Sequence, residues 1–120
     1  MTRDMDLIRE LLLAVEAFPT GYGEALVIVG RSETEVGYHL KLLLEAGYIE
    51  GHDVATHGHD GPRVLPSRMT WEGHDFLDAI RDEGVWKKVQ EKLLAVGGQT
   101  TLVILKELAL SVTRSHLGLA

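Results

Sequence analysis

The sequence predicts an α+β fold that is mainly helical. Two observations support this: a capped helix at residues 32–46 ends at Gly47 and runs directly into strand-like sequence, and apolar stripes at helical spacing occupy most of the remaining chain. The expected order is helix, strand, helix and β-hairpin, followed by a two-helix C-terminal extension. That order is typical of a winged helix. We therefore expect a winged-helix domain at residues 1–70 and a helical, dimer-forming extension at residues 71–120.

The first quarter of the chain predicts one helix and one short strand. Residues 4–17 form the helix, and its single apolar stripe consists of Leu7, Ile8, Leu11, Leu12 and Val15. Pro19 ends this helix because proline cannot continue it. Residues 25–29 are apolar and mostly β-branched and lie between Gly23 and Gly30, a pattern that predicts a strand.

Residues 32–47 have the form of a recognition helix. Ser32 and Glu35 match a capping box, in which each side chain accepts a hydrogen bond from a free backbone amide at the helix start. Gly47 is placed for a left-handed C-cap. The expected buried stripe consists of Val36, Leu40, Leu43 and Leu44.

Two strands and a polar turn follow this helix. Residues 48–56 and 64–69 predict a hairpin around the glycine-rich turn at residues 57–62. Simple alternation places Leu65, Ser67 and Met69 on one face of the second strand, with Val64 and Arg68 on the other. Pro66 lacks an amide donor, which is typical of an edge strand.

The last fifty residues predict two helices. Thr70 is the expected N-cap of a helix at residues 71–95, with a possible kink at Gly84, and a final helix ends near Leu117. The apolar positions of the final helix cover too wide an arc for a single buried stripe, which suggests a partner surface. We expect a homodimer through Leu102, Leu105, Leu108 and Val112. The alternative is that this helix packs between the first helix and the hairpin of its own chain.

Composition restricts the possible functions. The chain has 120 residues, no cysteine and a formal net charge of −6. Thiol nucleophiles, thiolate metal sites and disulfides are therefore excluded. No apolar run approaches the roughly 18 residues that a membrane span requires, and the acidic N-terminus lacks the basic region of a signal peptide. We expect a cytoplasmic protein that makes no membrane contact.

Duplex DNA is the first partner that the winged-helix pattern predicts, as for a DNA-binding transcription regulator. The outward face of the helix at residues 32–46 is a poor base reader, because it has one lysine, no arginine and no side-chain amide. The wing contains more cationic side chains, which could contact phosphates. Its acidic residues leave open the alternative that it is a solvated loop without a DNA contact. The expected DNA contacts are Tyr38, Lys41, His57, His59, Arg63 and Arg68.

A partner protein is the alternative. Tyr38 and Leu42 lie one helical turn apart on the outward face, and an exposed aromatic beside an exposed leucine is typical of protein interfaces. Together with the net charge of −6, this pair suggests an inhibitor of a host nucleic-acid-binding defence complex, comparable to an anti-CRISPR protein. Alternatively, the two side chains pack against the C-terminal helices of this chain or of a partner subunit.

No enzyme, metal or cofactor is expected. His74 and Asp78 could form a base and its orienting carboxylate, but no nucleophile or phosphate loop stands beside them in the sequence. Five potential ligands, His52, Asp53, His57, His59 and Asp60, match no standard metal motif. The Gly-Tyr-Gly at residues 21–23 is too short for a nucleotide fingerprint.

Three blocks resemble a family known as domain of unknown function 2513. The opening residues 3–16 look like its first signature, and Gly37-Tyr-His39 with Leu42-Leu-Leu-Glu-Ala-Gly47 is similar to its middle block. Residues 70–82, beginning Thr-Trp-Glu-Gly-His, with Trp86-Lys-Lys88, resemble its most distinctive block. The resemblance implies a winged-helix-like protein of phages and other mobile elements. It carries no activity and no catalytic residue.

Overall fold

Helix α2 (Glu33–Glu45) has the predicted caps and contacts each of the elements around it. Its neighbours are helix α1 (Met5–Glu16) and the two strands β1 (Ile49–Asp53) and β2 (Val64–Met69). The Ser32 hydroxyl accepts from the Glu35 amide at 3.0 Å, and the Ser32 amide donates to the Glu35 carboxylate at 3.2 Å. Gly47 follows the helix at φ 78°, so the predicted capping box and left-handed stop are both confirmed.

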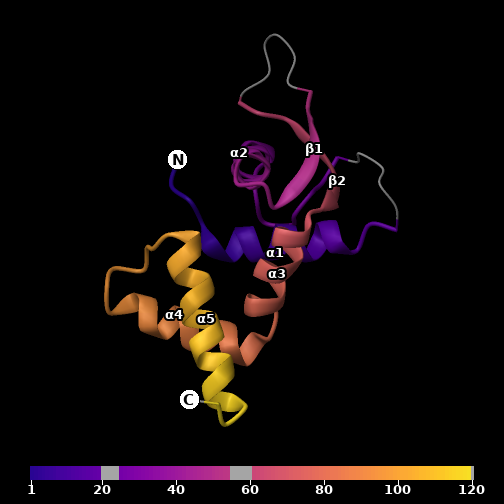
Figure 1. Cartoon of the computed structure of the whole chain (residues 1–120). Coiled ribbons are helices and arrows are strands. Elements are labelled where there is room, and N and C mark those ends of the chain that lie inside the picture. Colours follow the sequence, from indigo (N-terminus) through magenta and orange to yellow (C-terminus); the bar gives the residue numbers. More distant parts are fainter. Residues whose placement is uncertain (20–24, 55–60, 120) are drawn as a thin grey trace. The chain divides into compact units, whose positions relative to one another are not determined.

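The computed structural model describes residues 1–19, 25–54 and 61–119 and is α+β, mainly helical. These residues contain five helices and one two-stranded antiparallel sheet (Figure 1). The chain forms two compact units. We call Met1–His74 the helix–hairpin unit and Asp75–Ala120 the C-terminal unit. Helix α3 (Trp71–Ile80) begins in the first and ends in the second.

The core of the helix–hairpin unit combines α1 and α2 with the hairpin. The predicted stripe of α1 is confirmed, since all five of its apolar members are buried. The α2 stripe is confirmed at Val36, Leu40 and Leu43, whereas Leu44 is only half-buried. Burial of these aliphatic side chains is the main force that holds α2 in place, because isolated helices of this length are marginal in water.

The hairpin is confirmed, but the side chains of β2 do not alternate simply. Glu50 pairs with Arg68 and Gly51 with Pro66, so Ser67 is an extra residue that forms a β-bulge. Val64 and Pro66 are therefore buried before the bulge and Met69 after it. The predicted assignment of faces was wrong, because one inserted residue reverses the phase of a two-residue period.

Residues 25–29 do not form the predicted strand. Residues 25–28 have no regular secondary structure, and a turn begins at Val29. Val27 and Val29 are 85% and 98% exposed, although a paired, half-buried strand would cover one face of such residues. The β-branched composition alone was misleading, because strand propensity reflects packing that this segment does not make.

The predicted single helix at residues 71–95 is also wrong. It is two helices, α3 and α4 (Glu83–Leu94), separated at Arg81 and Asp82. Asp82 is extended and its carboxylate accepts from the Val85 amide at 2.9 Å, so it is the N-cap of α4. The break thus lies at a capping aspartate and not at Gly84, and three helices follow the hairpin where two were expected. Thr70 caps α3 as predicted, accepting from the Gly73 amide at 3.1 Å.

Helix α5 (Leu102–His116) packs on α4. Of the residues predicted to form a dimer interface, Leu105 and Val112 are buried within the chain, and Leu102 and Leu108 are half-buried. A partner could not reach the two buried side chains. The exposed apolar residues of α5 are instead Val103, Ile104 and Leu110.

Two helical glycines allow a backbone segment to approach closely. A Cβ at Gly37 in α2 would overlap the carbonyl oxygen of Pro62, and one at Gly73 in α3 would overlap that of Tyr48. These carbonyls belong to the backbone, so they cannot move as a flexible side chain can. The two positions fix how the chain before β2 and the chain before β1 lie against helices.

A polar network joins the start of α1 to α2. The buried His39 ring accepts from the Asp4 amide through Nε2 at 2.8 Å and donates from Nδ1 to the Glu35 carbonyl at 2.8 Å. The Asp4 carboxylate caps α1 through the Leu7 amide and accepts from Arg31 at 2.6 Å. His39 lies outside the predicted apolar stripe of α2, yet it is one of the most buried residues of the unit.

Hydrogen bonds and charges at the starts of α1 and α2 lower the pKa values of two carboxyl groups. Burial opposes ionisation of Asp4, but the hydrogen bonds from Arg31 and the Leu7 amide and the charge of Arg31 outweigh it, so its pKa lies below the ordinary 3.8. The hydrogen bond from the Ser32 amide is the main cause that lowers the pKa of Glu35 below 4.5.

No helix within residues 1–19, 25–54 and 61–119 is long and apolar enough to cross a membrane.

Gly73→Ala should destabilise the fold by about 1–3 kcal/mol, the usual cost of forcing a methyl group into a packed site. Gly84→Ala is the matched control: it is also a helical glycine, but its added Cβ would meet only the end of the Asp82 side chain, at 3.1 Å. Alanine there should preserve or raise stability, by up to about 1 kcal/mol, because alanine favours helix. Urea unfolding followed by circular dichroism measures both. Equal effects of the two substitutions would contradict the close packing at Gly73.

The pKa shifts predict acid-sensitive stability. Because the folded-state pKa values of Asp4 and Glu35 lie below those of the unfolded chain, both carboxylates stabilise the fold above their unfolded pKa values. That stability is lost as the pH falls through the folded values. Asp4→Asn keeps an oxygen for the Leu7 amide but removes the charge, so it should flatten the decline below about pH 4.5. Urea unfolding across this range tests it, with the exposed Asp75→Asn as control; an unchanged acid limb in Asp4→Asn would rule the explanation out.

Candidate binding surface of the helix–hairpin unit

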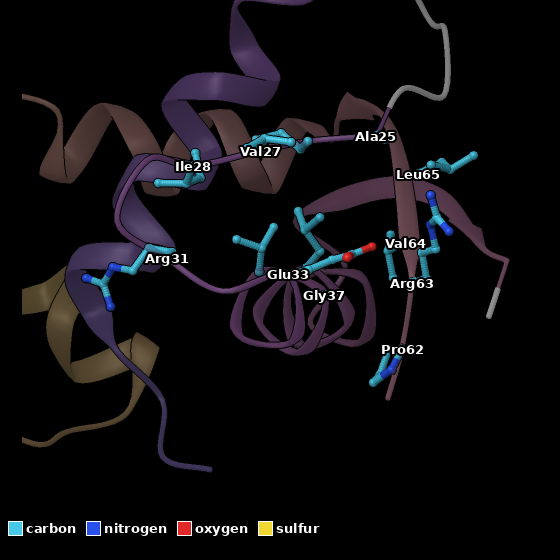
Figure 2. Close-up of a pocket in the computed structure, with 13 residues that line it drawn as sticks. Ala25, Val27, Ile28, Arg31, Glu33, Gly37, Pro62, Arg63, Val64 and Leu65 are labelled. Carbon is cyan, nitrogen blue, oxygen red and sulfur yellow. The ribbon is translucent and has the colours of Figure 1, made fainter. Parts of the chain in front are cut away.

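A pocket of about 330 Å³ lies among residues 25–28, the first turns of α2 and the start of β2 (Figure 2). Most of its lining is aliphatic. The apolar lining residues are Ala25, Leu26, Val27, Ile28, Val36, Leu40, Val64 and Leu65. Gly37 and Pro62 also line it, where their close approach brings the hairpin next to α2. The pocket can therefore hold an apolar group, as small ligand and side-chain sites commonly do.

Three charged residues complete the lining: Arg31, Glu33 and Arg63. Arg31 is held by the Asp4 carboxylate at 2.6 Å and lies 3.5 Å from that of Glu35, so its charge is largely compensated. Glu33 and Arg63 are exposed and stand on opposite walls, α2 and the residue before β2. A group entering the pocket thus meets an apolar interior and a rim with both signs of charge.

Two of the cations expected to contact DNA are held by carboxylates. Lys41 on α2 lies 3.4 Å from Asp53 at the end of β1. Arg68 donates from Nε and Nη2 to the Glu50 carboxylate across the strand pair, at 2.9 Å and 2.7 Å, and from Nη1 to the Met69 carbonyl. Surface pairs of this kind add little stability. They do offset the positive charge that would attract phosphate.

Arg63 is the exception among the predicted wing cations. Its side chain is exposed, and within the described residues it forms no ion pair. Its amide donates to the Asp53 carboxylate at 3.3 Å. His57 and His59, the other predicted wing contacts, lie outside the described residues. Among the described residues of the predicted wing, the positive charge open to a partner is thus that of Arg63.

Tyr38 and Leu42, the predicted protein-binding pair, are half-buried on α2 and do not line the pocket. The Tyr38 ring meets the His39 ring edge to face, with centroids 5.7 Å apart. Part of the Tyr38 surface is therefore used within the unit. The structure brings Arg63 to the pocket but leaves Tyr38, Leu42, Lys41 and Arg68 outside it.

The charge of the chain is divided unequally. Residues 1–74 contain 6 Lys and Arg against 12 Asp and Glu, a net charge of −6, whereas residues 75–120 contain 6 of each. The whole excess of negative charge thus belongs to the unit that carries α2 and the hairpin. A field of this sign repels phosphate and attracts basic surfaces.

Within the described residues, no group of three or more His, Asp or Glu side chains could hold a metal ion. Three of the five potential ligands named from the sequence, His57, His59 and Asp60, lie outside those residues. The carboxylate of Asp78 lies 3.0 Å from Arg81, where the sequence suggested a pairing with His74.

Sequence reasoning missed the pocket because it assigned residues 25–29 to a strand. One signal was available: about a dozen residues separate Pro19 from Arg31, too few for a helix as well as a paired strand. No sequence signal indicated that His39 is buried, because a helical pattern does not show which side chain bonds to a backbone amide 35 residues away.

Comparison with known proteins agrees on one family. A model of the family described as "Hypothetical protein (DUF2513)" matches residues 2–99. An uncharacterized protein of Haemophilus influenzae is 32% identical over 114 residues, which cover 93% of this chain and 95% of the relative. No solved structure matches the chain. The chain therefore belongs to the DUF2513 family.

Proposed function

We propose that the helix–hairpin unit is a protein-binding module whose pocket takes an apolar side chain of its partner. The aliphatic pocket of about 330 Å³ is the observation that carries this proposal. Interfaces depend on a few apolar anchors that fill such pockets, surrounded by a polar rim. Arg63 and Glu33 supply that rim, and neither has an ion pair in the described part of the chain.

The charge of the unit supports a basic partner. With a net charge of −6 on residues 1–74, association is fastest and most selective with a positive surface. Nucleic-acid-binding proteins have such surfaces, because they bind phosphates through Lys and Arg. An acidic module that covers one of them would compete with its nucleic acid. Inhibition of a host nucleic-acid-binding complex, for a protein carried by a phage or mobile element, is the form of this function that we favour.

Duplex DNA is the second candidate. It is supported by the order of helix and hairpin, in which α2 has the place of a winged-helix recognition helix and β1 and β2 that of the wing strands. The exposed Arg63 favours it as well. On this hypothesis Tyr38, Lys41 and Arg68 also contact the duplex, after Lys41 and Arg68 exchange their carboxylate partners for phosphates.

Leu65→Asp should strongly reduce capture of the partner. It places a carboxylate on a half-buried wall of the pocket, where an apolar anchor would strip it of water, and should weaken binding at least about tenfold. Val29→Asp is the matched control, because Val29 is 98% exposed and does not line the pocket. Affinity purification from host lysate with the wild type and each of the two variants, quantified by mass spectrometry, measures how much partner each protein retains. A partner retained equally by both variants would contradict the role of the pocket.

A mobility-shift assay at about 50 mM salt, where electrostatic affinity is high, tests the DNA candidate. The protein-binding proposal predicts no shift of duplex DNA of any sequence. If duplex DNA does bind, Arg63→Ala should weaken that binding. Protein would then be the wrong class of partner for this surface. Tyr38→Asp with Leu42→Asp, in the purification experiment, shows whether the outer face of α2 also contributes to binding a protein.

A further inference from the structure

The exposed side of α5 carries an apolar row at seven-residue spacing. Val103 and Leu110 of α5 are 63% and 39% exposed, and Leu117, the C-cap of the helix, is 69% exposed. Leu105, Ala109 and Val112 on the other side of the helix are buried, where α5 packs on α4. A seven-residue repeat keeps a row of side chains on one face of a helix, the pattern by which helices pair.

Two opposite charges lie within this row. Glu107 and Arg114 are exposed and are seven residues apart. Seven residues correspond to about 10 Å along a helix, too far for the two to form an ion pair with each other. Within the described residues neither forms a salt bridge with any other side chain. The face therefore reads Val, Glu, Leu, Arg, Leu at alternating steps of four and three residues.

This order is self-complementary when a second copy is placed antiparallel to it. We propose that the α5 face is the interface of a homodimer, with a two-fold axis near Leu110. Val103 then faces Leu117 of the partner subunit, and Glu107 faces Arg114 of the partner subunit; symmetry repeats both contacts. In a parallel pair Glu107 would face Glu107 of the partner subunit, so the charges select the antiparallel arrangement.

The shape of the α5 face and the net charge of the C-terminal unit also support a second copy of the chain as the partner. A shallow hollow of about 310 Å³ lies at the centre of the face, lined by Glu107, Leu110, Ser111 and Arg114. On the proposed axis it receives Leu110 of the partner subunit. Residues 75–120 carry no net charge, so two C-terminal units meet without the repulsion that two helix–hairpin units would experience. This inference is independent of the partner proposed for the helix–hairpin unit.

Charge reversal tests the interface and its direction together. Glu107→Arg or Arg114→Glu alone places two like-charge pairs across the axis and should weaken self-association about tenfold or more. The two variants mixed in equal amounts form a heterodimer in which both pairs are again opposite, and the double variant restores the homodimer. Sedimentation equilibrium of the full chain, 13.2 kDa as a monomer, measures each case, with circular dichroism as the check on folding.

A cysteine cross-link gives a second, independent reading. The chain contains no cysteine, so Leu110→Cys introduces the sole thiol, and mild oxidation should join two chains at the axis. Ser115→Cys, exposed on the same helix but off the row, should cross-link far less.

A monomeric wild type up to high concentration, a dimer insensitive to both charge reversals, or no recovery on mixing would each overturn the proposal.

Discussion

The contact between His39 and the Asp4 amide is the interaction on which the helix–hairpin unit depends. The His39 ring is buried, the contact spans 35 residues, and both ring nitrogens form hydrogen bonds of 2.8 Å. Through it the start of α1, the Arg31 side chain and the first turns of α2 become one network. A buried imidazole without these partners would be costly, so the network specifies one placement of α2 where apolar packing alone would accept several.

The position of α2 then determines what the surface of the unit can do. Gly37 allows the chain before β2 to approach the helix, and the pocket opens between them and residues 25–28. Lys41 and Arg68 form ion pairs with carboxylates of β1, so their positive charges are offset within the unit. Helix α2 keeps its predicted caps, and the pairing of Lys41 and Arg68 with carboxylates is one reason why we propose a basic protein partner in place of a phosphate backbone. The C-terminal unit carries no net charge, which favours the self-association that we propose for it.

Much of the fold could be predicted from sequence where the signal is local. Ser32 with Glu35, Gly47 and Thr70 each act within a few residues, and the structure confirms all of them. The failures have non-local causes. The strand at residues 25–29 needed a partner strand, the bulge at Ser67 depends on pairing register, and the burial of His39 depends on a distant amide. Asp82 is instructive, since its capping signal was local but a continuous apolar stripe concealed it. The pocket was not foreseen because three segments that are separate in the sequence form it, and one of them had been assigned to a strand.

Whether the pocket meets protein or nucleic acid is the central question, and site-specific photo-cross-linking answers it most directly. A photoreactive phenylalanine analogue at position 65 would stand in the pocket wall, and the same analogue at position 29 provides a control outside it. Irradiation of host cells that express the variant should give a cross-linked adduct at position 65. Nuclease treatment should leave the mass of this adduct unchanged. An adduct sensitive to nuclease, or equal adducts at positions 65 and 29, would contradict a protein-binding pocket.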